Sequence, residues 1–175
     1  MQRGSVCVPD IPERRSALVG MEPHDLIRER TGLWIQRLYA PNGLQEPVSG
    51  LDLPEQPNTA SHKGGVHALW VAPGEYLLVS EEAQTIEGAA LSDLSHARTV
   101  FRIDAEPARA ILAKSCPLDL RLSNFPPGHC AQSGLGSLSP VPILVHHLES
   151  GSHMDIYVPR SYGQHVYAWL VDGAI

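Results

Sequence analysis

Two apolar runs joined by a short turn limit the fold of this chain more than any other feature. Residues 66–71 and 75–80 are rich in aliphatic and aromatic side chains, and Pro73 and Gly74 lie between them. Runs of this length around a Pro/Gly turn predict a β-hairpin. The second run is apolar at consecutive positions, so both faces of its sheet need to be covered by other parts of a structure.

The rest of the chain alternates strand-like and helix-like segments. Further strands are expected at residues 33–39, 99–104, 130–133, 141–148 and 154–158. Helices are expected at residues 25–30 and 82–94, directly after Asp104, and after Ser161. Strands interleaved with a few helices predict an α+β fold, with a mixed or antiparallel sheet and helices packed against it.

Two of the expected helices have recognisable start signals. Asp104 fits an N-cap and Pro107 fits the first turn, where the missing N–H of proline costs nothing. Ser161 and Gln164 have the spacing of a capping box. The buried stripe of the first of these helices is expected to comprise Ala108, Ile111 and Leu112.

Composition divides the chain into two parts. Residues 1–32 are rich in proline and charge and predict an irregular N-terminal arm, whereas residues 33–175 have the length of a single α+β domain. Within the domain, residues 45–65 contain three prolines and several small polar residues, which predicts a long loop.

Charge and hydropathy exclude several classes of partner. The net charge is −6, from 13 basic and 19 acidic residues, and no Lys/Arg cluster provides a footprint for nucleic acid. No apolar run approaches the ~20 residues of a membrane span. Three widely spaced cysteines, Cys7, Cys116 and Cys130, argue against a disulfide framework and favour a cytoplasmic protein with reduced thiols.

Catalytic and nucleotide-binding motifs are missing from the sequence. No nucleophile elbow, P-loop or dinucleotide fingerprint occurs. The nearest glycine cluster, residues 134–137, predicts a bulged strand or turn and not a phosphate cradle. We therefore expect the chain to bind no flavin, nicotinamide or other nucleotide.

The histidines do not show the spacing of metal ligands. His146 and His147 are adjacent on an expected strand, so their side chains should point to opposite faces. His62 and His67 are five residues apart across an expected loop-to-strand boundary, and His129 has only one neighbouring cysteine. The sequence thus predicts ordinary surface or core histidines and no metal.

Other reactive side chains are also expected to be structural. Cys116 lies at an expected helix C-terminus, where the dipole disfavours a thiolate, and Cys130 is expected to be a buried small hydrophobe. Glu81 and Glu82 fit a favourable charge pair at a helix N-terminus. The tryptophans are expected in the core, with an interface role open for one of them: Trp34, Trp70 and Trp169. The sequence therefore predicts no catalytic, cofactor-binding or metal-binding residue in this chain.

One segment carries a specific family pattern. Residues 108–120 follow A-R-x-[IL]-L-x-K-x-C-P-L-D-L, and residues 125–132 follow F-P-P-G-x-C-A-Q. This segment resembles the gamma subunit of heterotetrameric sarcosine oxidase. Flanking blocks extend the resemblance to residues 66–172, with local departures at residues 105–107 and 134–136.

The resemblance implies a fold similar to the folate-binding domain of glycine-cleavage T-proteins. It also implies an assembly of alpha, beta, gamma and delta chains that oxidises sarcosine to glycine and passes the one-carbon unit to tetrahydrofolate. Other chains would hold the cofactors: FAD in beta, FMN between alpha and beta, NAD and tetrahydrofolate in alpha, and zinc in delta. The chain itself would be non-catalytic and inactive alone.

Two alternatives remain open at this point. The chain could be a stand-alone folate-binding one-carbon transferase, similar to aminomethyltransferases. That function needs a carboxylate to hold the pterin, for which Asp119 is the candidate, although turn hydrogen bonding is the more common role of such a residue. The chain could also be the equivalent subunit of an oxidase or dehydrogenase for another secondary amine.

Overall fold

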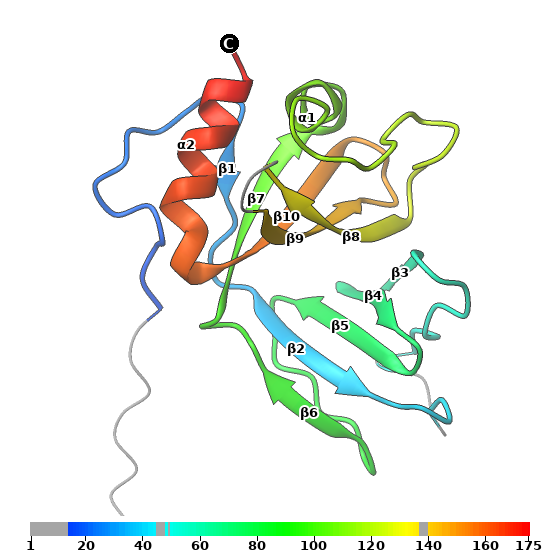
Figure 1. The fold of residues 1–175 in the computed structure, drawn as a ribbon. Coiled ribbons are helices and arrows are strands. Elements are labelled where there is room, and N and C mark those ends of the chain that lie inside the picture. Colours follow the sequence, from blue (N-terminus) through cyan, green and yellow to red (C-terminus); the bar gives the residue numbers. More distant parts are fainter. Residues whose placement is uncertain (1–13, 45–47, 49, 137–139) are drawn as a thin grey trace, which may run out of the picture.

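Two five-stranded antiparallel sheets and two α-helices make up the described part of the chain (Figure 1). The computed structural model describes residues 14–44, 48, 50–136 and 140–175. No described helix is long and apolar enough to cross a membrane. The expected α+β class with antiparallel strands is therefore confirmed, although the strands form two sheets and not one.

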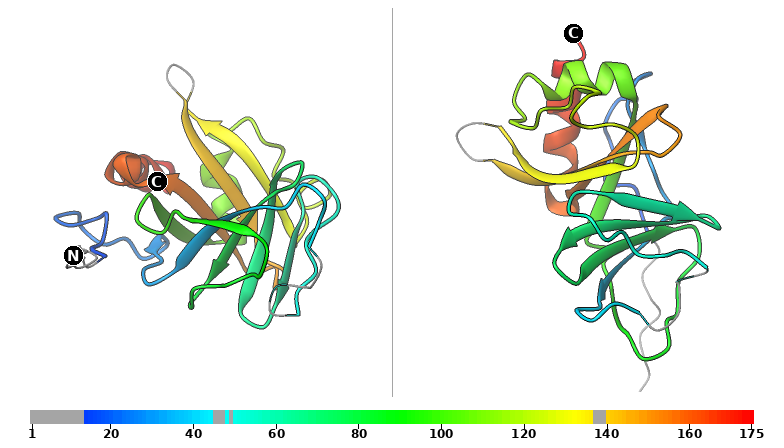
Figure 2. Two further views of the ribbon diagram at one scale, coloured as in Figure 1. Left: turned by 90° about the horizontal axis from the view of Figure 1, so that it is seen from below. Right: turned by 90° about the vertical axis from the view of Figure 1, so that its right-hand side faces the viewer.

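The first sheet is covered by helices on the face turned away from the second sheet (Figures 1 and 2). Its strands, in spatial order, are β1 (Arg28–Glu29), β7 (Arg98–Asp104), β10 (His153–Pro159), β9 (Val141–His147) and β8 (His129–Leu135). The covering helices are α1 (Ala105–Leu112) and α2 (Gly163–Gly173), the latter preceded by the 3-10 turn η1 (Arg160–Tyr162). The expected buried stripe of α1 is confirmed, because Ala108, Ile111 and Leu112 are all buried.

The second sheet contains the predicted hairpin. Its strands, in spatial order, are β3 (Ala60–Lys63), β4 (Val66–Ala72), β5 (Glu75–Ser80), β2 (Trp34–Tyr39) and β6 (Ala90–Asp93). The β4–β5 pairing and strand β2 are confirmed at the predicted places.

Successive side chains along each strand point to opposite faces of its sheet and therefore pack in different apolar clusters. In β7, Val100 points into the layer between the sheets, whereas Phe101 and Ile103 pack under the helices. In β5, Leu77 and Val79 face the first sheet, and Tyr76 and Leu78 pack in a third cluster on the opposite face. That third cluster is closed by the chain's own segments around Val48, Leu51 and Leu91. The expected cover on both faces of β5 is thus supplied within the chain.

Two predicted helices are wrong. Residues 82–94 contain strand β6, which pairs with β2, and Gly88 adopts φ +73°, a left-handed conformation that does not occur inside an α-helix. Residues 25–30 contain β1, which pairs with β7. The expected loop at 45–65 is also partly wrong because it contains β3; residues 45–47 and 49 lie outside the described part.

The capping interactions predicted at the starts of the two helices do not form. Asp104 precedes α1 as expected, but its side chain makes no cap hydrogen bond and lies 3.1 Å from His153 Nε2. The predicted capping box is wrong, because Ser161 lies in η1 and α2 begins at Gly163. The amide of Gln164 instead donates to the backbone oxygen of Val19 at 3.1 Å.

The described part of the N-terminal arm is packed against the rest of the chain. The guanidinium of Arg14 lies 4.4 Å above the Trp34 ring. Tyr167 Oη donates to the backbone oxygen of Glu22 at 2.8 Å. Residues 14–32 are therefore tied to both β2 and α2, while residues 1–13 lie outside the described part.

Candidate functional site

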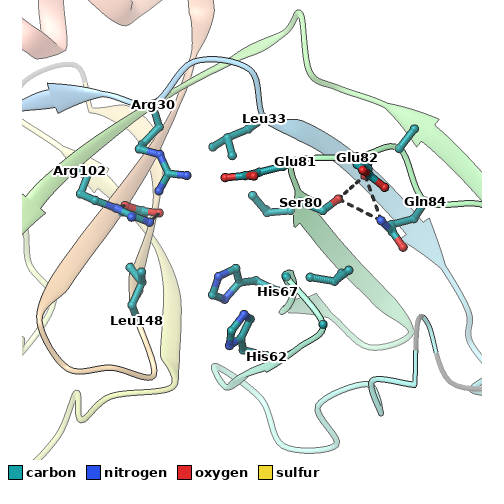
Figure 3. A pocket seen from close by; sticks show the side chains of 16 residues that line it. Arg30, Leu33, His62, His67, Ser80, Glu81, Glu82, Gln84, Arg102 and Leu148 are labelled. Atoms are coloured by element: carbon teal, nitrogen blue, oxygen red, sulfur yellow. Dashed lines mark hydrogen bonds and ion pairs between the residues drawn. The ribbon is translucent and has the colours of Figure 1, made fainter.

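An open pocket of about 690 Å³ lies between the two sheets (Figure 3). The first sheet contributes Arg102 and Asp155 to its lining, and Arg30 and Leu148 come from the positions directly after β1 and β9. The second sheet and its turns contribute His62, Gly64, Gly65, Val66, His67, Val79, Ser80, Glu81, Glu82, Ala83 and Gln84. Arg30 and Glu81 point toward each other across the pocket (Figure 3). The pocket is thus lined by charged and polar groups of both signs from both sheets.

A bidentate ion pair forms one wall of the pocket. Arg102 and Asp155 are direct cross-strand neighbours on β7 and β10. Nε and one terminal nitrogen of Arg102 each donate to a different oxygen of Asp155 at 2.7 Å. These hydrogen bonds raise the pKa of Arg102 above its ordinary value. The pair is therefore satisfied within the chain, as a mostly buried carboxylate requires.

The opposite rim of the pocket is formed by a tight histidine hairpin. Strands β3 and β4 pair in a register that sets His62 directly opposite His67. Gly64 and Gly65 form the two-residue turn with φ +60° and +78°, the pattern of a type I′ hairpin turn. Opposed residues project from the same face, and the two imidazoles stack with ring centroids 4.1 Å apart.

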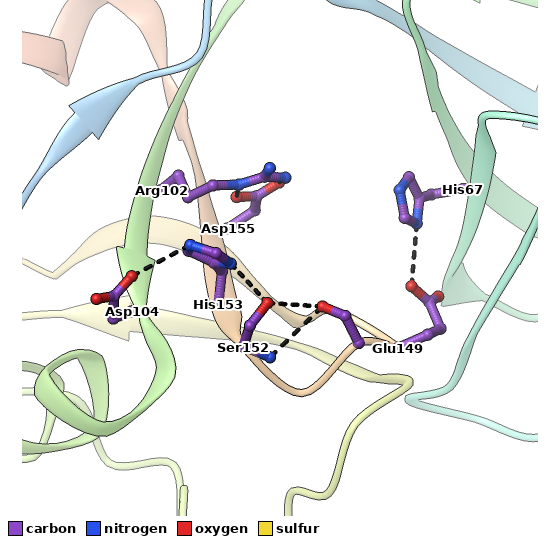
Figure 4. A network of polar contacts seen from close by, with 8 residues as sticks. His67, Arg102, Asp104, Glu149, Ser152, His153 and Asp155 are labelled. Atoms are coloured by element: carbon purple, nitrogen blue, oxygen red, sulfur yellow. Dashed lines mark hydrogen bonds and ion pairs between the residues drawn. The ribbon is translucent and has the colours of Figure 1, made fainter.

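Glu149, in the turn between β9 and β10, reaches this hairpin from the other sheet (Figure 4). Its Oε2 lies 3.2 Å from Nδ1 of His67, and its Oε1 lies 3.5 Å from Nε2 of His146. His146 is buried, and its ring meets that of His67 edge-on at 5.2 Å. Three histidines and one carboxylate from both sheets therefore converge at the pocket rim.

Burial and neighbouring charges act differently on the two buried members of this group. Burial works to raise the pKa of Glu149, but the imidazoles of His146 and His67 lower it well below its ordinary range. Burial lowers the pKa of His146. An ionised carboxylate therefore lies beside a buried imidazole whose neutral form is favoured.

Asp119, the candidate pterin ligand, lies elsewhere. It is exposed and is not among the residues that line the pocket between the sheets. It accepts hydrogen bonds from Arg121 Nε at 2.8 Å and Asn124 Nδ2 at 2.6 Å. The Arg121 guanidinium holds the pKa of Asp119 well below its usual range. Its observed contacts are those of the turn role.

The two described cysteines are free and buried. Burial raises the pKa of the Cys130 thiol to about 12, and its Sγ lies 3.2 Å from the backbone oxygen of Thr59. The expectation that Cys130 packs as a small hydrophobe is confirmed, since it belongs to the core between the sheets. Cys7 lies outside the described residues.

Other predicted positions are partly confirmed. His146 and His147 point to opposite faces of β9 as expected, and His147 Nδ1 lies 3.0 Å from the backbone oxygen of Phe125. Gly134 lies in β8, where a Cβ would meet Pro140 at 2.6 Å, so it allows a close packing contact. Glu81 and Glu82 border the pocket and begin no helix. The tryptophans are only partly buried and lie at the margins of the core: Trp34, Trp70 and Trp169.

The sequence reasoning missed the convergence of Glu149 with the histidine hairpin. Residues 64 and 65 are both glycine, and a Gly-Gly pair is a recognised signal for a two-residue hairpin turn. That signal would have aligned His62 with His67. No local signal could have placed Glu149 there, because it arrives from the other sheet.

Comparison with known proteins points to one family. No family model matches the chain. Over 137 residues it is 31% identical to sarcosine oxidase subunit gamma from Corynebacterium sp. (strain U-96), a match that covers 71% of this chain. Over 135 residues it is 30% identical to sarcosine oxidase subunit gamma from Arthrobacter sp., covering 70% of this chain. The chain spans 64% of the length of each of these relatives.

A solved structure shares the fold. A chain of heterotetrameric sarcosine oxidase from Corynebacterium sp. U-96, in complex with pyrrole 2-carboxylate, matches with a TM-score of 0.70 and 24% sequence identity. The match covers 85% of this chain and 82% of that chain. The resemblance carried by residues 108–120 and 125–132 is thereby confirmed: this chain is similar in sequence to the gamma subunits of sarcosine oxidase and has the fold of a chain from that heterotetrameric enzyme.

Proposed function

We propose that this chain is the gamma-type subunit of a heterotetrameric sarcosine oxidase, an oxidoreductase that acts on a secondary amine. It supports the assembly of the enzyme and carries out none of the chemistry itself. The observation that carries this proposal is the 31% identity over 137 residues to a sarcosine oxidase gamma subunit. The shared fold over 85% of the chain supports it independently of the sequence motif.

The partners that we propose are alpha, beta and delta subunits. In this arrangement the other subunits hold FAD, FMN, NAD, zinc and tetrahydrofolate, and the assembly converts sarcosine to glycine while transferring the one-carbon unit to tetrahydrofolate. We also propose a cytoplasmic location, which the free thiols of Cys116 and Cys130 support.

The chemistry of the described residues supports a non-catalytic role. The charged pair in the pocket wall, Arg102 and Asp155, is internally satisfied. The Cys130 thiol has a pKa of about 12 and is buried, so it is a poor nucleophile at neutral pH. We therefore propose that no residue of this chain takes part in the oxidation of the amine.

Co-expression tests the assembly role. The chain is produced together with candidate alpha, beta and delta subunits, and the complex is separated by size-exclusion chromatography. We expect co-elution with the flavin absorbance, and we expect omission of this chain to reduce the yield of assembled, active oxidase. Separate elution, combined with unchanged assembly and activity when the chain is omitted, would contradict the proposal.

The purified assembly also identifies the amine. Oxygen consumption is compared for sarcosine, other N-methyl amino acids and proline derivatives. We expect the largest kcat/KM with sarcosine. A clear preference for another secondary amine would keep the assembly role and replace the substrate.

A further inference from the structure

We propose that His62, His67 and Glu149 form a binding site for a divalent transition-metal cation of the zinc class, at the rim of the pocket between the two sheets. This inference is independent of the assembly role, because all three residues belong to this chain. It departs from the sequence expectation of no metal, which rested on spacing along the chain alone.

The hairpin places two of the ligands in advance. The cross-strand register sets His62 opposite His67, and the stacked rings hold their nitrogens on the same side of the sheet. The two-residue Gly64–Gly65 turn fixes the register between β3 and β4. Both imidazoles point into the pocket beside each other (Figure 3).

The third ligand comes from the other sheet. One ligand atom from each of His62, His67 and Glu149 lies within 4.8 Å of the other two. Around a tetrahedral zinc ion with N and O ligands at about 2.0–2.2 Å, ligand atoms are separated by roughly 3.3 Å. No pair of these atoms therefore has to approach by more than about 1.5 Å, and Nδ1 of His67 and Oε2 of Glu149 are already 3.2 Å apart. The ring of His62 is the exposed member of the group, so it has the most room to move.

Unsatisfied polar atoms at the same place provide a second, independent observation. Oε1 of Glu149 and Nδ1 of His67 are buried and make no hydrogen bond of good geometry among the described residues, although Nδ1 of His67 lies 3.2 Å from Oε2 of the same carboxylate. Both ring nitrogens of the buried His146 are also without a hydrogen-bond partner there, although Nε2 faces Glu149. Buried polar atoms normally have a hydrogen-bond partner, so this group of side chains lacks one polar partner. A cation bound between His67 and Glu149 supplies that partner.

The donor types select the metal. Two imidazoles and one carboxylate suit zinc and its neighbours in the first transition row, whereas Mg²⁺ and Ca²⁺ prefer ligands that are all oxygen. Three protein ligands leave a fourth tetrahedral position for water or another ligand, and two of the three, His62 and His67, line the open pocket. His146, behind Glu149, is placed to orient the carboxylate as an outer partner.

Binding at this position would join the two sheets. His62 and His67 belong to the second sheet, and Glu149 lies in the β9–β10 turn of the first. A ligand that binds only the folded state stabilises it by mass action. Zinc should therefore raise the melting temperature of the full chain.

Calorimetric titration of the full, untagged chain with zinc chloride tests the site, after the chain has been stripped with a chelator and exchanged into buffer. We expect one zinc ion per chain. Co²⁺ in place of zinc should give visible absorption bands of a tetrahedral or five-coordinate site. Absence of zinc binding to the parent chain would overturn the proposal.

Substitutions show whether these residues hold the ion. We expect His67→Gln and Glu149→Gln each to weaken zinc binding by more than about 100-fold, because even outer-shell partners typically contribute 10–100-fold. His62→Gln should also weaken zinc binding and remove the cobalt bands, and the variant should fold normally because His62 is exposed. The matched control is His165→Gln, an exposed histidine on α2 whose loss should leave the affinity unchanged.

Circular dichroism of each variant separates loss of a ligand from loss of the fold. A folded His62→Gln variant that binds zinc as tightly as the parent would place the ion elsewhere and contradict the site. Because every measurement uses this chain alone, a failure to co-elute with oxidase subunits has no bearing on the outcome.

Discussion

At the scale of single residues, Cys130 shows how the layer between the sheets controls chemistry. Its side chain is fully buried among residues of both sheets, and its Sγ faces the backbone oxygens of Thr59 and Trp70 at 3.2 and 3.4 Å. A thiolate in this position would be desolvated and would face two carbonyl dipoles. The neutral thiol is therefore strongly favoured.

We expect Cys130 to be unreactive toward iodoacetamide in the folded chain. The raised pKa of about 12 leaves almost no thiolate at pH 8, and raising the pH to 9 should not produce measurable labelling at this position. Mass spectrometry of peptides after timed labelling measures the modification, and unfolding in urea provides the reactive reference. Rapid labelling of Cys130 without denaturant would show that the thiol is more accessible than the fold indicates.

Among the elements, helix α1 depends on a small apolar face. Leu112 is 0% exposed and packs against α2 and the first sheet. Truncation of a buried leucine removes contacts and leaves a cavity that the surroundings fill only in part.

Leu112→Ala should lower the free energy of unfolding by about 2–5 kcal/mol. Leu122→Ala is the matched control, because Leu122 is 60% exposed and its truncation should change stability by less than about 0.5 kcal/mol. Urea denaturation followed by circular dichroism measures both variants. Coinciding midpoints for Leu112→Ala and the parent would mean that α1 does not pack as described.

Two hairpin turns of the second sheet allow the energetic cost of backbone strain to be measured separately from the cost of steric overlap. Gly65 and Gly74 have similar positive φ values, +78° and +72°. Among the described residues, a Cβ on Gly65 would meet nothing within 4 Å, whereas a Cβ on Gly74 would lie 2.5 Å from the backbone of Pro41.

We expect Gly65→Ala to cost about 1–2 kcal/mol, the strain of an L-residue in the left-handed region. Gly74→Ala should cost clearly more, because the chain at Pro41 has to move as well. Thermal and urea unfolding of both variants provide the comparison. Equal destabilisation by the two substitutions would show that the close approach of Pro41 to the turn does not affect stability.

At the scale of the whole molecule, one apolar layer joins the two sheets. It includes Ile35, Leu77 and Val79 from the second sheet and Val100, Leu144 and Tyr157 from the first. Because neither sheet can expose this layer without cost, we propose that residues 33–175 unfold as a single domain.

Tryptophan variants test that proposal. In Trp169→Phe the remaining indoles, Trp34 and Trp70, report on the second sheet, whereas in the double variant Trp34→Phe/Trp70→Phe the indole of Trp169 reports on α2. Each variant should show the same urea midpoint by fluorescence as by far-UV circular dichroism. Different midpoints for the two probes in either variant would mean that the sheets unfold separately.

Local patterns were sufficient for most strands and for both true helices. The hairpin around Gly74 and the helix after Asp104 were predicted because turn residues and apolar periodicity act over only a few positions. The helix predicted at residues 82–94 was wrong for the opposite reason. The apolar spacing there fits a helix, yet residues 90–93 form backbone hydrogen bonds with β2. Long-range pairing outweighed local preference there.

By itself the sequence determined the fold class, the two-faced burial of β5 and the resemblance to sarcosine oxidase gamma subunits, since each depends on patterns that are local or motif-like. Only the tertiary structure decided that the strands divide into two sheets, that Asp119 lies away from the pocket, and that Glu149 meets His62 and His67. The physical reason is that these contacts join residues far apart in the chain. Their formation depends on how the two sheets bury a shared apolar layer, and no short stretch of sequence determines that geometry.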